Sequence, residues 1–404
     1  MAKNDNLKDF LADVADAIRE KTGTTRLINP QDFSNEIASI ETSKTMAVDA
    51  PLKDVNFYDC DGTRLYSYSW DEVLAMTELP PLPSRMGLTC QEWNYTLEDI
   101  KEQSHHKADV GAIYATDDGM TRLYINTLAD DTEVSFTIQQ STGDVTNGSW
   151  GDGADIVPKG NTGDIKYSHT YAKSGAYVIR IGTSRDGSYL SSFGANKFAT
   201  ETLQKIETAN WVNSIRYFNR QYNLESITLS KNADFLYSAN VPILGYASSL
   251  KTLILPKGTS VKTEYASGMC TYAGLSIVSL PNEITFSPSN LFSLLAGNQG
   301  LRRIVLPQGI DSIGERMFKG CIVLSEVAIP NSVTSIGSAA FAGCDRLTKL
   351  DFSHFTAVPS LSTYPDSPFP SEWPTIIVPD ALYDEWIAGS WKNYASNIVK
   401  ASEA

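Results

Sequence analysis

The sequence predicts a multidomain, mainly β protein whose carboxyl-terminal half is a solenoid of parallel strands. Two patterns predict this class: a seven-residue motif recurs along the second half, and alternating apolar strands bounded by turn residues precede it. The chain has 404 residues, too many for one ordinary core, so several domains are expected. In chain order we expect short helices, a small α/β module, a β-sandwich, the repeats and a helical cap.

Composition and charge narrow the class of partner. The chain is 42% hydrophobic and 20% charged, which is typical of globular proteins. Its 47 acidic and 33 basic residues give a net charge of −14, which disfavours nucleic acid as a partner. The sequence shows neither an apolar signal-peptide core nor a run long enough to span a bilayer. We therefore expect synthesis in a host cytoplasm without membrane insertion.

Residues 1–45 are expected to form two short helices that serve attachment or oligomerisation. Leu7, Leu11, Val14 and Ile18 step by four, three and four residues, which places them on one apolar seam. A second helix begins at Pro30, which suits the first helical position. A helical hairpin folded onto the next domain is the alternative interpretation.

Residues 46–125 are predicted to form a small α/β module. Asp61-Gly62 predicts a hairpin turn, Ser69 can cap the helix of "WDEVLAMTEL", and "TLEDIKEQ" predicts a second helix. Asp118-Gly119 predicts a second hairpin over 111–125. The acidic residues near both turns lack the other ligands and the closing Glu of a calcium loop, so plain turns are expected.

Residues 126–185 alternate apolar and polar side chains, which predicts strands. The run "WGDG" from Trp150 and the run "HTY" from His169 resemble the hallmarks of immunoglobulin-like sandwiches of the polycystic-kidney-disease (PKD) type. This resemblance implies that Trp150 and Tyr171 are core residues and that Asp152 lies in a tight turn. It also implies that His169 is structural rather than catalytic.

A repeat with apolar first, fourth and sixth places fills residues 186–380. Its spacings are 26, 25, 26, 23, 23 and 26 residues. The copies begin at Leu224, Leu250, Leu275, Leu301, Leu324, Leu347 and Trp373, and a further copy at Leu203 can open the series. A single short strand cannot bury its apolar side, but stacked copies share one core. Proline in the seventh place ends most strands because it lacks an N–H for the ladder.

The two 23-residue copies, "LRRIVLPQGIDSIGERMFKGC" and "LSEVAIPNSVTSIGSAAFAGC", resemble BspA-like leucine-rich repeats of bacterial surface proteins. The tail over 381–404 is similar to the helical cap that follows such repeats, with Asp380 able to cap its first helix and Trp386 and Trp391 able to cover the last coil. Cys321 and Cys344 lie at equivalent places of adjacent coils. A disulfide is geometrically permitted there, but a buried column of thiols is favoured.

The side chains between the ladder positions form one face of the predicted repeat sheet. We take this face as the candidate ligand-binding surface, represented by Thr252, Ile254, Ser279, Arg303, Val305, Glu326, Lys349 and Asp351. The alternative is a solvated face whose opposite charges pair across neighbouring strands.

The motifs favour a non-enzymatic protein. The sequence holds no nucleophile elbow, phosphate-binding glycine loop or metal-ligand spacing, so no catalytic residue, cofactor or metal is expected. The shape "ADAIR.KTG…I.P.DF" near the start resembles a segment of tail-associated and other virion proteins of phages and prophages.

Taken with the PKD-like and BspA-like segments, this resemblance implies a virion fibre or receptor-binding protein. Its expected partners are other virion proteins through the N-terminus and a host surface glycan or protein. A homo-oligomer is expected, with a trimer favoured by analogy with other fibres. A bacterial BspA-like surface adhesin is the alternative, and a glycan-active enzyme is a third, less favoured class.

Overall fold

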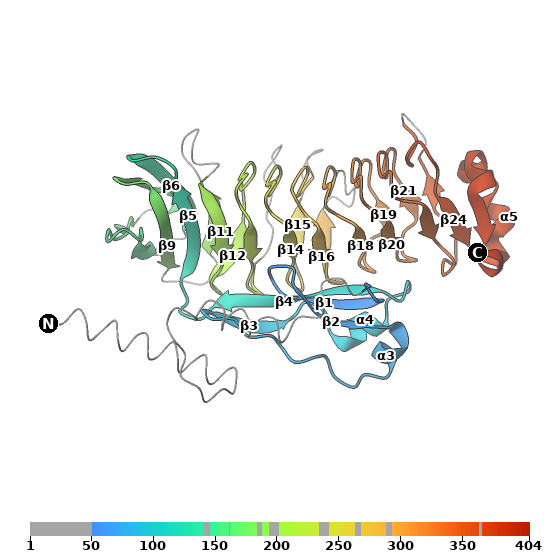
Figure 1. The fold of residues 1–404 in the computed structure, drawn as a ribbon, viewed down its shortest axis with the longest axis horizontal. Coiled ribbons are helices and arrows are strands. Elements are labelled where there is room, and N and C mark those ends of the chain that lie inside the picture. Colours follow the sequence, from blue (N-terminus) through green and yellow to red (C-terminus); the bar gives the residue numbers. More distant parts are fainter. Residues whose placement is uncertain are drawn as a thin grey trace.

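The computed structural model describes residues 51–140, 146–160, 162–183, 188–193, 202–233, 242–262, 268–287, 293–362 and 366–404. The predicted attachment segment over 1–45, with Leu7, Leu11, Val14 and Ile18, lies outside the described residues. The described chain is mainly β, and its solenoid has about seven turns over residues 205–400, as the repeat period predicted (Figure 1).

The small module is a four-stranded sheet with two short helices. Its strands are β1 (Val55–Tyr58), β2 (Arg64–Tyr68), β3 (Leu88–Trp93) and β4 (Ala108–Thr116), in the order β2-β1-β4-β3. Helices α3 (Trp70–Leu74) and α4 (Leu97–Lys101) begin after Ser69 and Thr96, whose hydroxyls complete capping boxes. The hairpin around Asp61-Gly62 and both helices are confirmed.

The predicted hairpin over 111–125 is wrong. Strand β4 belongs to the module, whereas β5 (Thr121–Thr127) belongs to the next sheet, so the Asp118-Gly119 turn redirects the chain between two sheets. The Arg122 guanidinium fixes this turn, because it binds Asp117 at 3.0 Å and Asp118 at 2.9 Å and donates to the Gly87 carbonyl. A local turn signal cannot reveal which sheet the next strand joins.

Residues 121–228 form a sandwich of two sheets. Besides β5, its strands are β6 (Thr132–Gln140), β7 (Thr146–Ser149), β8 (Gly163–Tyr171), β9 (Gly175–Thr183), β10 (Ser188–Phe193), β11 (Leu203–Glu207), β12 (Val212–Ile215) and β13 (Ser226–Thr228). One sheet has the order β12-β10-β6-β8 and the other β13-β11-β5-β9-β7. Trp150 and Tyr171 are buried as expected, and the Tyr171 hydroxyl donates to the Trp150 carbonyl at 2.7 Å. His169 binds Asp152 at 2.7 Å and stacks on Trp150, which is a structural role.

The sandwich passes directly into the first coils of the solenoid. Strand β10 pairs with β6, and β11 pairs antiparallel with β5 and parallel with β13. Strand β9, which precedes the predicted boundary between residues 185 and 186, therefore shares a sheet with β11, which follows it. One hydrophobic core extends from Leu123 to Ile398.

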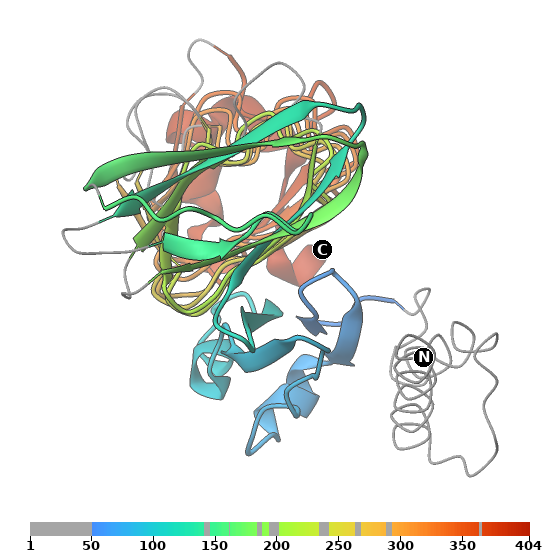
Figure 2. The ribbon, with the colours of Figure 1, turned by 90° about the vertical axis from the view of Figure 1, so that its left-hand side faces the viewer.

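The solenoid coils present two rows of parallel strands (Figure 2). One row contains β14 (Thr252–Ile254), β16 (Ile277–Ser279), β18 (Arg303–Val305), β20 (Glu326–Ala328), β22 (Lys349–Asp351) and β24 (Thr375–Val378). The other contains β15 (Ser260–Lys262), β17 (Thr285–Ser287), β19 (Ser312–Ile313), β21 (Ser335–Ile336) and β23 (Ser360–Leu361). The repeated leucines are buried.

The turn that the two 23-residue copies share stacks one coil upon the next. The rings of Phe318 and Phe341 lie 5.5 Å apart and nearly parallel. Cys321 and Cys344 are free thiols that donate to the carbonyls of Leu295 and Phe318. The column of buried thiols, rather than a disulfide, is what the structure contains.

The carboxyl-terminal cap consists of η3 (Asp380–Leu382), α5 (Tyr383–Trp386), η4 (Gly389–Asn397), β25 (Ile398–Lys400) and η5 (Ala401–Glu403). Trp386 and Trp391 are buried against the last coil, as expected. The expectation that Asp380 caps a helix is wrong, since its carboxylate accepts from the Ser402 amide and makes no cap bond. No helix among the described residues is long and apolar enough to cross a membrane.

A core substitution tests the shared column of leucines. Leu324→Ala removes a fully buried side chain from a close-packed coil, so it is expected to lower the free energy of unfolding by about 2–5 kcal/mol. Denaturant unfolding of the full chain measures this, with the exposed Arg346→Ala as control. A loss below about 1 kcal/mol would show that Leu324 is not in the core.

Candidate functional site

The small module lies on the repeat sheet rather than beside it. Strand β4 runs across β13, β14, β16 and β18, and it is buried along its whole length (Figure 1). Seen along the solenoid axis, the module covers one side of the coils (Figure 2). Tyr58 and Ile113 of the module pack with Ile254 and Ile277 of the coils, which forms an apolar seam between them.

Two glycines allow the module to approach this closely. A Cβ atom on Gly111, in the middle of β4, would lie 2.2 Å from the Ile254 Cγ2 atom. A Cβ atom on Gly62 would lie 2.4 Å from Thr252 Oγ1, and the φ of +89° at Gly62 also favours glycine. Any larger side chain at either position would push the two surfaces apart.

Several polar groups beneath the module are paired across the contact. The Asn94 amide donates to the Leu255 carbonyl at 3.0 Å and to Ser279 Oγ at 2.8 Å, and it accepts from the Gly111 amide. Ser279 Oγ in turn donates to the Asp109 carbonyl at 2.5 Å. Because buried polar groups without partners are costly, this register of module on sheet is specific.

Arg303 is the charged centre of the contact. Its Nε donates to the Asp109 carboxylate at 3.1 Å, and its two terminal nitrogens donate to the carbonyls of Lys53 at 2.8 Å and Asp54 at 2.6 Å. Both side chains of the ion pair are buried. Burial raises the pKa of the Asp109 carboxyl, and the attraction of Arg303 opposes that shift. Burial favours loss of the Arg303 proton, but Asp109 and Glu326 outweigh it and raise the Arg303 pKa.

The structure corrects the expectation of an open recognition face along the sheet. Five of the eight candidate residues are buried, namely Thr252, Ile254, Ser279, Arg303 and Val305. Glu326 is half-buried and pairs with Lys107 of the module, while Lys349 and Asp351 are exposed. The expected cross-strand pairing occurs between Arg303 and Glu326 at 3.5 Å. A ligand would have to displace the module to reach these five buried side chains.

A cleft of about 360 Å³ remains where the module ends, beside Lys349 and Asp351. His105 closes its inner side: Nε2 donates to the Leu306 carbonyl at 3.1 Å, and Nδ1 accepts from the Lys107 amide at 3.3 Å. These two partners require a neutral ring, and burial lowers the pKa of His105 to about 4. His354 donates to the Ile329 carbonyl, and burial lowers its pKa as well.

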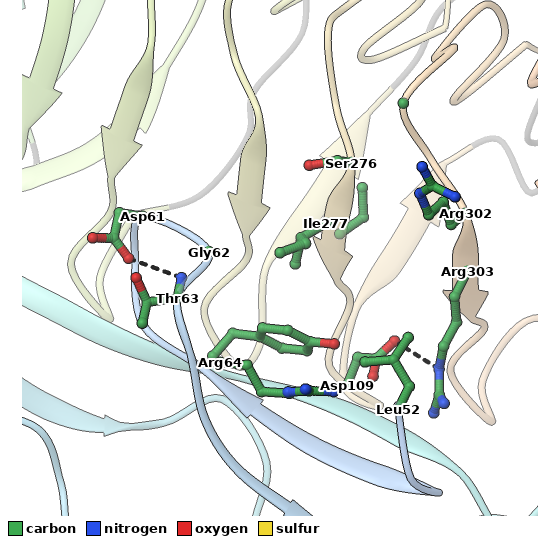
Figure 3. A pocket seen from close by; sticks show the side chains of 13 residues that line it. Leu52, Asp61, Gly62, Thr63, Arg64, Asp109, Ser276, Ile277, Arg302 and Arg303 are labelled. Atoms are coloured by element: carbon green, nitrogen blue, oxygen red, sulfur yellow. Dashed lines mark hydrogen bonds and ion pairs between the residues drawn. The ribbon is translucent and has the colours of Figure 1, made fainter. Parts of the chain in front are cut away.

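A second cleft, of about 600 Å³, opens between the β1–β2 hairpin and the coils (Figure 3). Arg64 lines it from the hairpin, and Ser276, Ile277 and Arg302 line it from the repeats. Its two carboxylates are already bound: Asp61 to Arg85 and Asp109 to Arg303. Within the described ranges, no group of His, Cys, Asp and Glu side chains could hold a metal ion.

The sequence alone does not single out the module residues that build this contact, among them Asn94, Asp109 and Gly111. One signal was present. A lone glycine inside an otherwise apolar strand, as Gly111 is within "ADVGAIYAT", marks a close approach of another backbone. The nearly continuous apolar character of that strand also indicates burial on both faces.

Comparison with known families supports the repeat interpretation. A family profile described as BspA type leucine rich repeat region, with six copies, matches residues 294–364. A search with the whole chain finds no match among curated proteins. Repeats of this type indicate a surface adhesion or repeat protein.

Removing the Arg303 charge tests the contact. Arg303→Met leaves the Asp109 carboxylate buried without its partner, so it is expected to lower the free energy of unfolding by about 3–5 kcal/mol. Arg303→Met combined with Asp109→Asn is expected to recover part of that loss, as measured by a double-mutant cycle in denaturant. Equal stability of Arg303→Met and the wild type would contradict the assigned pair.

The buried histidine predicts a pH dependence of stability. The folded-state pKa of His105, about 4, lies below its usual 6.5, so the unfolded chain binds more protons within that interval. His105 therefore stabilises the fold above pH 6.5 and loses this contribution as the pH falls toward 4. We expect the loss of this contribution to lower the free energy of unfolding by about 1–2 kcal/mol, which is less than the full pKa shift implies because the ring is partly exposed. Unfolding of His105→Asn should show a shallower decline between pH 7 and pH 4.5, and an unchanged decline would contradict this assignment.

Proposed function

We propose that this protein is a non-enzymatic adhesion protein that recognises a host cell surface, and that it acts as a fibre or receptor-binding protein of a phage virion. The observation that carries the proposal is the architecture of the repeats. BspA type repeats, matched over residues 294–364, continue the core of a sandwich and carry a second module locked onto their sheet. Repeat solenoids provide long, rigid surfaces for binding.

The N-terminal sequence supports the virion part of the proposal. Residues 1–45, which lie outside the described part of the chain, resemble a segment of tail-associated phage and prophage proteins. Under the proposal this segment joins other virion proteins and assembles a homo-oligomer, with a trimer favoured by analogy with other fibres. Several linked copies multiply weak single contacts into firm attachment. The PKD-like sequence hallmarks over 150–177 agree with an exposed, ligand-facing protein.

The state of the acidic residues favours adhesion over glycan cleavage. Hydrolysis of a glycosidic bond generally requires two carboxyl groups that are free to give or take protons. The two carboxylates of the larger cleft, Asp61 and Asp109, are each held by an arginine. Burial would raise the pKa of Asp61, but its hydrogen bond to the Thr63 amide and its pair with Arg85 lower it below the usual range, so it would be a poor proton donor.

A bacterial surface adhesin is the second candidate function. The match of residues 294–364 to BspA type repeats favours it as much as it favours a phage protein. The two candidates differ in location, because a fibre is part of a particle and an adhesin is part of a cell envelope.

Fractionation of the source culture distinguishes the two candidates. Particles are induced, banded by density and analysed by mass spectrometry, in parallel with the cell-envelope fraction. We expect the protein in the particles, and we expect the purified full chain to bind host cells saturably. Recovery only from the envelope would favour the adhesin, and absence of cell binding would contradict both.

Deletion of residues 1–42 extends the same experiment. Since this segment is assigned to attachment and oligomerisation, the shortened chain is expected to be lost from particles and to sediment as a smaller species than the full chain. Retained assembly onto particles with an unchanged oligomeric state would refute this role.

A further inference from the structure

The larger cleft concentrates positive charge in an acidic protein. Three arginines and two aspartates line it, although the whole chain carries a net charge of −14. Both aspartates are bound by arginines, as described above. Arg302 is exposed, and its guanidinium makes no ion pair with any residue in the described segments. Arg64, which has an interaction of its own, lines the cleft from the β1–β2 hairpin (Figure 3). A local field of this sign attracts anions to the cleft.

The remaining wall of the cleft suits a sugar ring. Leu52, Tyr58 and Ile277 provide apolar surface beside the guanidinium groups. The Ser276 hydroxyl donates to the Lys251 carbonyl at 3.1 Å, so its lone pairs remain able to accept from a ligand hydroxyl. A volume of about 600 Å³ accommodates a short oligosaccharide segment.

The cleft is also held in shape before any ligand arrives. One wall is the turn at Gly62, fixed against Thr252, and the far side is Arg303, fixed by Asp109 and two backbone carbonyls. Arg302 immediately precedes Arg303 in the chain, so its backbone is held by the same anchor. A site between two locked surfaces loses little conformational entropy on binding.

We propose that this cleft binds an anionic saccharide, with Arg302 pairing with its acid group and Ser276 accepting from a neighbouring hydroxyl. This inference rests on the proposed adhesion function and names the chemical class of its ligand. A guanidinium pairs with carboxylate, sulfate and phosphate groups alike through two parallel hydrogen bonds. The module is therefore a part of the recognition site, because the cleft exists only where module and coils meet.

Titration calorimetry with the full chain tests the ligand class. The probes are a glucuronate-containing tetrasaccharide, a sulfated tetrasaccharide, a glycerol-phosphate oligomer and a neutral maltotetraose. We expect at least one anionic probe to bind at least tenfold more tightly than maltotetraose, with weaker binding at higher salt. The three anionic probes distinguish which acid group is preferred. Equal affinity for neutral and anionic probes, or no binding of any, would overturn the proposal.

Matched variants place the binding in this cleft. Arg302→Ala is expected to weaken binding of the preferred probe at least tenfold, and Arg302→Lys to weaken it less. Arg346→Ala removes the same charge from an exposed position outside the cleft and is expected to bind like the wild type. Equal affinity of Arg302→Ala and the wild type would reject the cleft, and thermal melts of all three variants check that each one folds.

Cell binding separates this inference from the proposed function. If Arg302→Ala binds host cells as well as the wild type does, the cleft is not the recognition site while the adhesion function stands. If the wild type binds no cells but binds an anionic probe in a manner that depends on Arg302, the ligand class stands and the adhesion function fails.

Discussion

The buried ion pair between Arg303 and Asp109 is the constraint on which the arrangement of this protein depends. An arginine at the start of a repeat strand would ordinarily extend into water, but Arg303 lies beneath a second module. Removing two charges from water is costly unless the remaining hydrogen bonds are made. Arg303 meets that condition, because Asp109 and the carbonyls of Lys53 and Asp54 take up its donors. The pair therefore fixes both the position and the register of the module.

This constraint covers the first part of the repeat sheet and leaves clefts at the margins of the contact. The solenoid builds a regular face, and the module then covers its first part, with Gly62 and Gly111 allowing close packing. Clefts lie at the edges of the contact, one near Arg302 and one near His105. Each cleft combines residues from both units, so neither the repeats nor the module alone would form it.

The sequence predicts the parts of this structure that repeat or depend on neighbouring residues. The solenoid follows from a fixed period with leucine in a constant place, and the helices after Ser69 and Thr96 follow from local capping signals. The docking of the module could not be predicted in the same way, since Asp109 and Arg303 are 194 residues apart. The second hairpin failed for a similar reason, because strand partners are chosen by the tertiary fold. The small side chains of Thr252 and Ser279 fit a solvated face and a covered one equally well.

Zero-length cross-linking tests the docked module most directly. A carbodiimide joins an amine to a carboxylate only when the two are in contact, and two such pairs cross from module to coils: Lys107 with Glu326, and Lys257 with Asp99. The pair of Lys53 and Glu72, within the module, serves as an internal control at 2.9 Å. The account predicts that mass spectrometry of the treated full chain finds both crossing pairs together with the control. Recovery of the control pair alone would contradict it and would mean that the module does not rest on the repeat sheet in solution.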